Sequence, residues 1–269
     1  MKRVYIYIVI ALCGVSACTS PRQRILEDTR LSLVDKHDLT AILFHNLKQM
    51  TGKYVVYGQH NYEMDGFDSD TSRWRDEENR CDAYDVTGAY PAMASFDFLH
   101  FTNPVSWETK NLDYIKSKFY AAYERGNVLT FCWHYYNPVT GNNFYDTTQV
   151  VKHILPGGSR HETFKSDLKI IADFAHNAKN HVGELIPIIF RPWHEFDGNW
   201  FWWGRNHCTV EEFKELYRFT VTYLRDSLQV HNFLYAFSSD CGFTTEKEFL
   251  ERYPGDEYVD VIGWDIYLP

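Results

Sequence analysis

Short apolar runs recur along the chain and alternate with longer amphipathic segments. The apolar runs occupy residues 54–58, 92–96, 128–132, 186–190, 233–237 and 259–263. Each has the length and the aliphatic or aromatic content of a buried β-strand. The sequence therefore predicts six strands separated by helices, the βα alternation that is typical of parallel sheets.

The segments between these runs carry apolar residues at helical spacing. Residues 38–50, 112–122 and 164–175 each repeat apolar side chains three and four positions apart, which predicts helices with one buried face. A further helix is expected to open at Thr209, because Glu212 follows three positions later and completes a capping box.

Polar and aromatic residues follow nearly every predicted strand. They are Gln59 and His60, Asp97, Trp133 and His134, His194 and Glu195, Ser238 to Asp240, and Trp264 and Asp265. In a parallel barrel these strand ends converge on one face, where barrel enzymes carry their active sites. An open nucleotide-binding sheet would instead show a G-x-G-x-x-G turn after its first strand, and this chain has none there. We therefore predict an α/β fold of the (β/α)8 TIM-barrel type, of which about six βα units are present.

Composition and charge exclude some classes of protein. The 269 residues are 45% hydrophobic and 17% aromatic, which supplies a sizeable core and argues against disorder. The formal net charge of -9, without a stripe of Lys and Arg, argues against a nucleic-acid partner. The large aromatic share instead indicates exposed stacking surfaces of the kind that sugar rings bind.

The N-terminus has the order of an export signal. Basic residues precede an apolar stretch, and small residues stand directly before Cys18. We expect residues 1–18 to be a lipoprotein signal peptide, Cys18 to be lipidated and residues 19–37 to be a tether. The catalytic domain, residues 38–269, would then be exported and lipid-anchored to the bacterial cell envelope, at the outer membrane or cell surface.

The segment with the most chemistry is residues 191–204, which read RPWHEFDGNWFWWG directly after a predicted strand. Glycoside hydrolysis needs a proton donor at the leaving oxygen and a second carboxylate that attacks the anomeric carbon or activates water. Glu195 is the lead donor candidate, because tryptophans at a barrel mouth would shield it from water and favour the protonated acid. Arg191 is expected to orient the second carboxylate. His194 is expected to bind that carboxylate or a sugar hydroxyl.

This segment resembles glycoside hydrolase family 26, whose members are retaining barrel enzymes and mostly endo-β-1,4-mannanases. Further likeness lies in residues 57–60 (YGQH), 91–97 (PAMASFD), 133–138 (WHYYNP) and 263–267 (GWDIY). The resemblance covers roughly residues 40–269. It implies a TIM barrel that hydrolyses β-mannosidic bonds in mannan-type polysaccharides without a cofactor.

The resemblance also implies roles for individual residues. Glu195 would be the acid/base, and His194, Arg191 and Tyr267 would support the nucleophile. The residues expected to contact the substrate are His134, Trp200, Trp133, Asp265, Trp203 and His60.

One feature departs from the family. The family's nucleophilic glutamate stands at the end of the seventh strand, whereas this chain ends at Pro269, just after the sixth predicted strand. We therefore expect a C-terminally truncated barrel that lacks the nucleophile and shows weak or no turnover by itself. Asp97, Asp240 and Asp265 also follow strands, but each is more simply read as a hydrogen-bonding partner of loop backbone or of Arg191.

Other interpretations stay open. A family relative that acts on β-glucan or β-1,3-xylan, or a non-catalytic glycan-binding lipoprotein, would share these features. A zinc site made by His60, His134, His194 and Glu195 is disfavoured, because no two of them have the spacing of a His-Glu-x-x-His helix. We predict no metal, and a monomer whose partners are the polysaccharide and the membrane. Disulfide pairing stays open among Cys81, Cys132, Cys208 and Cys241.

Overall fold

The computed structural model describes residues 38–67, 72–75, 77, 80–103 and 111–266. The predicted signal peptide, the tether, Cys18 and Tyr267 lie outside these residues. Within the described ranges, no helix combines the length and the apolar character that a membrane crossing requires.

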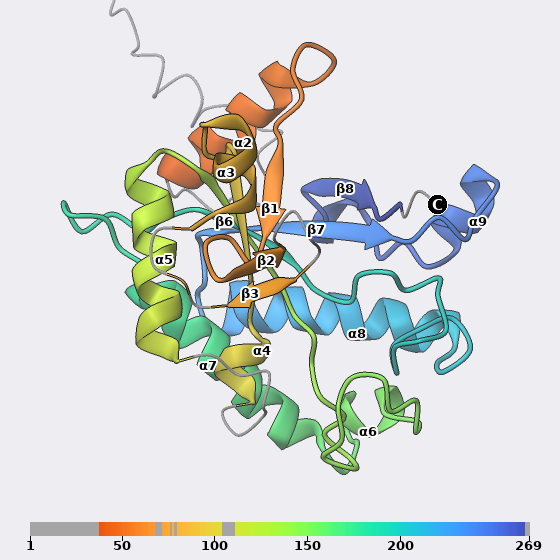
Figure 1. The fold of residues 1–269 in the computed structure, drawn as a ribbon. Coiled ribbons are helices and arrows are strands. Elements are labelled where there is room, and N and C mark those ends of the chain that lie inside the picture. The colour runs from red at the N-terminus through yellow and green to blue at the C-terminus, as the bar shows by residue number, and fades with distance from the viewer. Residues whose placement is uncertain (1–37, 68–71, 76, 78–79, 104–110, 267–269) are drawn as a thin grey trace, which may run out of the picture.

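Six parallel strands form one sheet in the order β1-β4-β5-β6-β7-β8 (Figure 1). Their bounds are β1 Gly58–His60, β4 Met93–Asp97, β5 Val128–Cys132, β6 Ile188–Arg191, β7 Phe233–Ser239 and β8 Val261–Trp264. Within this sheet, each strand pairs with the strand of the sheet that follows it in sequence, as in a barrel, whereas a doubly wound sheet reverses its order at a switch point. The sheet confirms the predicted fold class and is consistent with an incomplete (β/α)8 barrel.

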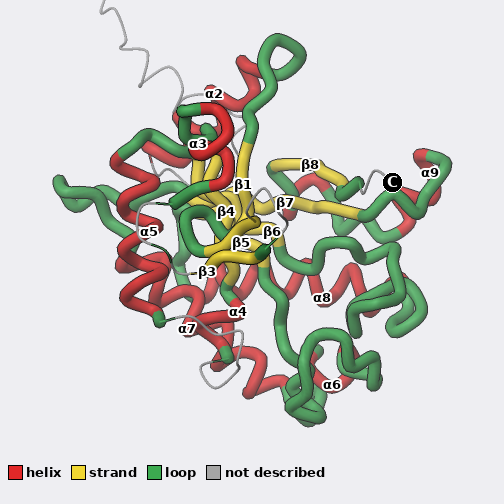
Figure 2. The backbone as a smooth tube through the Cα atoms, viewed as in Figure 1, coloured by secondary structure: helices red, strands yellow, loops and turns green. Residues whose placement is uncertain are grey.

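Helices connect the strands and lie around the sheet (Figures 1 and 2). The longer ones are α2 Asp38–Met50, α5 Leu112–Glu124, α7 His161–Asn177 and α8 Val210–Thr222. The shorter ones are α3 Asp82–Thr87, α4 Leu99–Thr102, α6 Val151–Ile154, α9 Glu246–Glu251, the π-helix η1 Tyr223–Ser227 and the 3-10 helix η2 Asp256–Tyr258. The capping box predicted at Thr209 and Glu212 is present at the start of α8.

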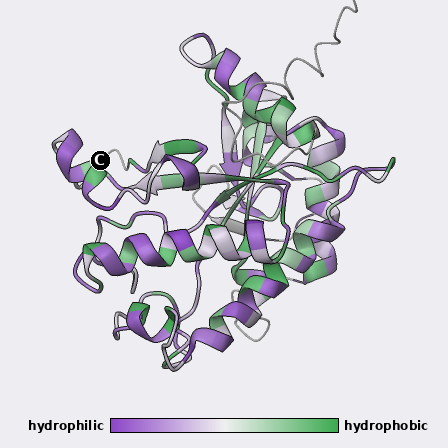
Figure 3. Ribbon diagram, turned by 180° about the vertical axis from the view of Figure 1, so that it is seen from behind, coloured by the Kyte–Doolittle hydropathy of each residue, from purple (hydrophilic) through white to green (hydrophobic). Residues whose placement is uncertain are grey.

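The central strands β6 and β7 bury both of their faces, because successive side chains point to opposite sides and each side meets a core. Ile188 and Phe190 pack into the large core between the sheet and the outer helices. Ile189, between them in sequence, joins Leu234 in a second core that includes apolar residues of α2. Seen from behind, the helices carry hydrophilic and hydrophobic stretches in alternation, as expected for elements with one buried face (Figure 3). Helix α2 therefore covers the inner face of the sheet, opposite α5, α7 and α8.

The first predicted strand is displaced in the structure. Residues 54–57 are extended surface chain with Val55 96% exposed, and β1 begins only at Gly58. The antiparallel hairpin of β2 Asp65–Phe67 and β3 Arg73–Arg75 had no counterpart among the predicted elements. Apolar content marks a strand only where the run faces a core, whereas residues 54–57 face solvent and the hairpin is largely polar.

Candidate active site

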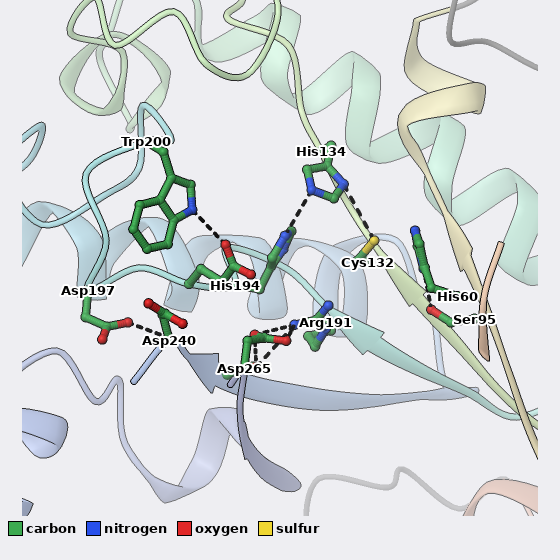
Figure 4. Close-up of polar contacts among 12 residues, drawn as sticks. His60, Ser95, Cys132, His134, Arg191, His194, Asp197, Trp200, Asp240 and Asp265 are labelled. Carbon is green, nitrogen blue, oxygen red and sulfur yellow. Dashed lines mark hydrogen bonds and ion pairs between the residues drawn. The ribbon is translucent and has the colours of Figure 1, made fainter. Parts of the chain in front are cut away.

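The carboxyl ends of the strands bring the predicted polar residues to one edge of the sheet. His60, Asp97, Cys132 and Arg191 are the last residues of β1, β4, β5 and β6. Asp97 lies opposite Cys132 in register, and Cys132 lies opposite Arg191. Asp265, which follows β8, reaches the same group of side chains (Figure 4). Residues from distant parts of the sequence thus share one site.

Glu195 lies in the loop after β6 and is held there by the backbone. Its amide donates to the carbonyl of Ser238 at 3.0 Å. Both Trp193 and Glu195 adopt left-handed conformations with φ of 53°. Such conformations cost of order 1–3 kcal/mol in residues other than glycine and gather at functional sites. Two left-handed residues with an ordinary one between them turn the chain sharply, and this turn points the side chain of Glu195 inward.

The Glu195 carboxyl is sheltered, with the residue only 6% exposed. Its Oε2 accepts a hydrogen bond from Trp200 Nε1 at 2.7 Å. The Trp200 ring packs against Gly198, where an added Cβ would lie 2.4 Å from a ring carbon. Gly198 therefore allows Trp200 to reach Glu195 while the tryptophan stays 39% exposed. A shielded carboxyl beside an accessible aromatic face is suited to protonating a bond in a sugar chain.

The loop that carries Glu195 is anchored to the loop after β7. Asp197 Oδ1 accepts from the amide of Asp240 at 2.6 Å, and Oδ2 accepts from the amide of Gly242 at 2.8 Å. Sequence reasoning missed this role of Asp197. The only indication of this role in the sequence was that Asp197 stands two residues after Glu195.

Two histidines form a chain of contacts that begins at Asp97. His134 Nδ1 lies 2.6 Å from Asp97 Oδ2. His134 Nε2 lies 3.2 Å from His194 Nε2 (Figure 4). When both rings are neutral, Nδ1–H of His134 donates to Asp97, so its Nε2 must accept from His194. His194 Nδ1 is buried and has no hydrogen-bond partner among the described residues. That nitrogen is available to accept a hydrogen bond from a donor that the described part of the chain does not supply.

Burial and charge fix the ionisation of His194 and Asp97. Burial, with Arg191 and His134 nearby, holds the pKa of His194 well below its usual range, so the ring is neutral. Burial alone would raise the pKa of Asp97, but His134, His60 and the donating amide of Leu99 hold it below its usual range. Asp97 is therefore an ionised carboxylate that orients His134. From the sequence, Asp97 was expected only to bond loop backbone or Arg191, as were Asp240 and Asp265, although it directly follows a predicted strand.

Arg191 pairs with Asp265 rather than with a second catalytic carboxylate. Its Nη1 lies 2.9 and 2.7 Å from the two oxygens of Asp265, and Ser238 Oγ donates to Asp265 Oδ2 at 3.0 Å. The alternative interpretation of Asp265, as a partner of Arg191, is confirmed. Direct contact of Asp265 with a substrate stays a prediction, and its Oδ2 already accepts from both of these partners.

The predicted substrate contacts of Trp133 and Trp203 need correction. Both tryptophans are 0% exposed, so neither ring can reach a polysaccharide. Trp133 Nε1 donates to Thr102 Oγ1 at 3.0 Å, and Trp203 Nε1 donates to the carbonyl of His194 at 2.8 Å. They fill the space behind the site, because apolar rings are more stable there than in water. Trp203 still matters, since it holds the backbone of His194.

His60 lies at the edge strand with an exposed side chain, and Ser95 Oγ lies 2.9 Å from its Nδ1. Its predicted contact with substrate stays a prediction. The group of potential metal ligands that comes together is not the one weighed from the sequence. Ligand atoms of His60, Asp97 and Cys132 lie within 4.8 Å of one another. The four cysteines whose pairing the sequence left open are all free thiols.

The chain matches a family model described as glycosyl hydrolase family 26 over residues 35–269. The chain belongs to glycosyl hydrolase family 26. Over 235 residues it is 40% identical to a mannan endo-1,4-beta-mannosidase of Bifidobacterium adolescentis, an alignment that covers 85% of this chain and 23% of that protein.

Solved structures of family 26 are similar as well. GH26C of a Muricauda species superposes with a TM-score of 0.76 at 39% identity, over 85% of this chain and 63% of that one. A family 26 beta-mannanase of Bacteroides ovatus gives 0.78 at 35% identity, over 85% of this chain and 66% of that one. The family 26 chain thus spans less than two thirds of the length of these relatives.

Proposed function

We propose that the protein to which this family 26 chain belongs is a retaining endo-β-1,4-mannanase, with Glu195 as its acid/base. The observation that carries the proposal is the sheltered Glu195 carboxyl, bonded to the indole of an exposed tryptophan. In the first step Glu195 donates its proton to the leaving glycosidic oxygen while a carboxylate attacks the anomeric carbon. In the second step it takes a proton from water.

The residues around Glu195 support a sugar on either side of it. The Trp200 ring offers an apolar face on the leaving side. His134 is partly exposed and held at a fixed angle by Asp97, which suits contact with the mannose at the cleavage point. Because Nε2 of His194 donates to His134, its unpartnered Nδ1 is an acceptor, and it suits a hydroxyl donor better than the attacking carboxylate. Arg191 would support that carboxylate through the charge it shares with Asp265.

The attacking carboxylate is proposed to come from outside the described residues. Asp97 is bonded to His134 and to two backbone amides. Asp265 is bonded to Arg191 and Ser238. Neither can attack an anomeric carbon without breaking these contacts, so each serves the site by orienting another side chain. Tyr267, beyond the described part, is proposed to hold the attacking carboxylate.

The proposed substrate is a β-1,4-mannan. Relatives from several organisms carry the name mannan endo-1,4-beta-mannosidase, and this chain is 40% identical to one of them and 29% identical to another. Discrimination from β-glucan and β-1,3-xylan is expected to depend on contacts to the hydroxyl at C2 of the sugar at the cleavage point. His134 is the described residue best placed to make such a contact.

Retention and hydrolysis must be measured separately to test this function. We expect the 269-residue chain to be retarded in a gel that contains mannan, while it releases few or no reducing ends from the same polymer. Replacement Trp200→Ala should strongly reduce the retardation, and Tyr54→Ala, in an exposed side chain before β1, should leave it unchanged. Stronger retardation by β-glucan or β-1,3-xylan would reassign the substrate. Rapid release of reducing ends would overturn the proposed source of the nucleophile.

We also propose that the protein is an exported lipoprotein and a monomer. The support is the signal pattern before Cys18 and the polar composition of residues 19–37. In a bacterial host, wild-type protein should take up a labelled fatty acid and partition into detergent. The variant Cys18→Ser should do neither, and label that persists in this variant would contradict the anchor.

A further inference from the structure

Three strand ends place a thiol, an imidazole and a carboxylate around one point. Cys132, His60 and Asp97 offer ligand atoms that all lie within 4.8 Å of one another. They are the last residues of β5, β1 and β4, so the backbone of the sheet fixes their relative positions. The proposed hydrolysis uses Asp97 only to orient His134 and gives Cys132 no task.

From this cluster we propose a binding site for a soft divalent transition-metal ion of the zinc class. Sulfur and imidazole ligands select such ions, and one carboxylate completes the three protein ligands of an open tetrahedral site. Ligand atoms in such a site stand roughly 3.3–3.8 Å apart, given metal–ligand bonds of about 2.0–2.3 Å. Side-chain movements of about 1 Å would therefore close the cluster around an ion.

Two of the three ligands carry a negative charge when they bind a metal, which suits a cation with two charges. Thiolate and carboxylate ligands together neutralise the ion, and metal binding displaces the thiol proton of Cys132. The nearby Arg191 would repel a cation, but its charge is paired with Asp265 at 2.7 Å. Ser95 Oγ holds one ring nitrogen of His60 at 2.9 Å, the kind of supporting contact that orients metal-bound histidines. His60 is exposed, whereas the other two ligands, Asp97 and Cys132, are buried.

His134 connects this site to the glycan site. Its Nδ1 lies 2.6 Å from Asp97 Oδ2 and 3.7 Å from Cys132 Sγ. An ion that binds Asp97 Oδ2 takes the oxygen that orients His134. The ion is therefore inferred to compete with the orientation of His134, and to act as an antagonist of the site rather than as a cofactor.

Cobalt titration of the full chain tests the site without any glycan, so its outcome is independent of the proposed mannanase function. Co²⁺ bound by a thiolate in a tetrahedral site gives a charge-transfer band in the near ultraviolet and visible bands from the metal. We expect both bands in the wild-type chain, and their loss when excess Zn²⁺ is added. Absence of the charge-transfer band at millimolar Co²⁺ would overturn the proposal.

Two cysteine variants and one histidine variant locate the ion. Cys132→Ser should abolish the charge-transfer band, whereas Cys241→Ser, at an exposed thiol, should leave it unchanged. His60→Ala alters an exposed side chain and should weaken Co²⁺ binding at least about tenfold with an unchanged far-ultraviolet circular dichroism spectrum. A band that survives Cys132→Ser, that disappears in Cys241→Ser, or whose affinity ignores His60→Ala would refute the site.

Discussion

Trp200 has two proposed roles. Its ring is a stacking surface for a sugar, and its Nε1 donates a hydrogen bond to Glu195. Replacement by Ala removes both, whereas replacement by Phe keeps an aromatic face and removes the donor. Titration calorimetry with mannohexaose should show about tenfold weaker binding for Trp200→Ala and a smaller loss for Trp200→Phe. Equal affinity of all three proteins would mean that no sugar stacks on this ring.

The ion pair of Arg191 and Asp265 is partly buried and has two short contacts. Removing one partner leaves the other charge without compensation, so Arg191→Met should lower the free energy of unfolding by about 2 kcal/mol in urea titrations. Lys214→Met, which breaks a pair whose carboxylate, Glu211, is 79% exposed, should change it by less than about 0.5 kcal/mol. Similar losses in the two variants would show that the Arg191 pair has no special weight.

The sequence predicted which residues gather at the site, but it did not predict which way their side chains point. Glu195 was identified because a strand, a His-Glu pair and clustered tryptophans coincide within residues 191–204. Trp203 in this cluster and Trp133, which follows an earlier strand, were assigned wrong roles, since position along a loop does not reveal which rings turn inward. The role of Asp97 in orienting His134 was missed, because the two residues are close in space but distant in sequence.

The capping box at the start of α8 was predicted from the sequence, and its contribution to the free energy of unfolding can be measured. Thr209 accepts from the amide of Glu212, and the Glu212 side chain accepts from the amide of Thr209. Thr209→Ala should therefore lower the free energy of unfolding by about 1 kcal/mol, measured by urea titration. Ser117→Ala, at an exposed hydroxyl within α5, serves as the control and should have little effect. A neutral Thr209→Ala would show that the helix start is held by packing alone.

The junction of β7 and β8 contains a carboxyl that should make stability depend on pH. Burial raises the pKa of Asp260 to about 6, although the amide of Tyr235 donates to it. An acid with a raised pKa binds its proton more tightly in the folded state. Its contribution therefore stabilises the fold at low pH and is lost as pH rises from about 4 to about 6.

Asp260→Asn should remove this loss, because the amide oxygen can still accept from Tyr235 without a charge. Urea titrations at pH 4, 5, 6 and 7 should show wild-type stability falling by about 1–2 kcal/mol relative to the variant as pH rises. The comparison cancels groups that titrate equally in both proteins. Parallel profiles would place Asp260 in contact with water rather than in the interior.

Elements were predictable where periodicity and burial agree. Residues 38–50 carry apolar side chains at helical spacing and form α2 over Asp38–Met50. The run 128–132 is buried on one side and partly buried on the other, and it forms β5 over those residues. Agreement fails at residues 54–57, which have the composition of a strand but face solvent. It also fails for the β2–β3 hairpin, whose residues are largely polar.

For the whole molecule, the alternation of strands and helices was enough to predict a parallel barrel-type sheet. The position of α2 on the inner face could not be predicted, because its pattern shows that one face is buried but not what buries it. The same limit applies to the site. Four strand ends meet there only because each strand pairs with the next along the chain.

Chemical rescue of the 269-residue chain tests the claim that Glu195 donates a proton to the leaving oxygen. Azide can replace a carboxylate that attacks the anomeric carbon, and a dinitrophenyl leaving group departs without a proton. With azide, we predict that wild type cleaves both mannohexaose and a dinitrophenyl β-mannoside. Glu195→Gln should cleave mannohexaose at least about 100-fold more slowly and the dinitrophenyl substrate at a similar rate. Equal cleavage of mannohexaose by both proteins, or no azide-dependent cleavage by wild type, would contradict the claim.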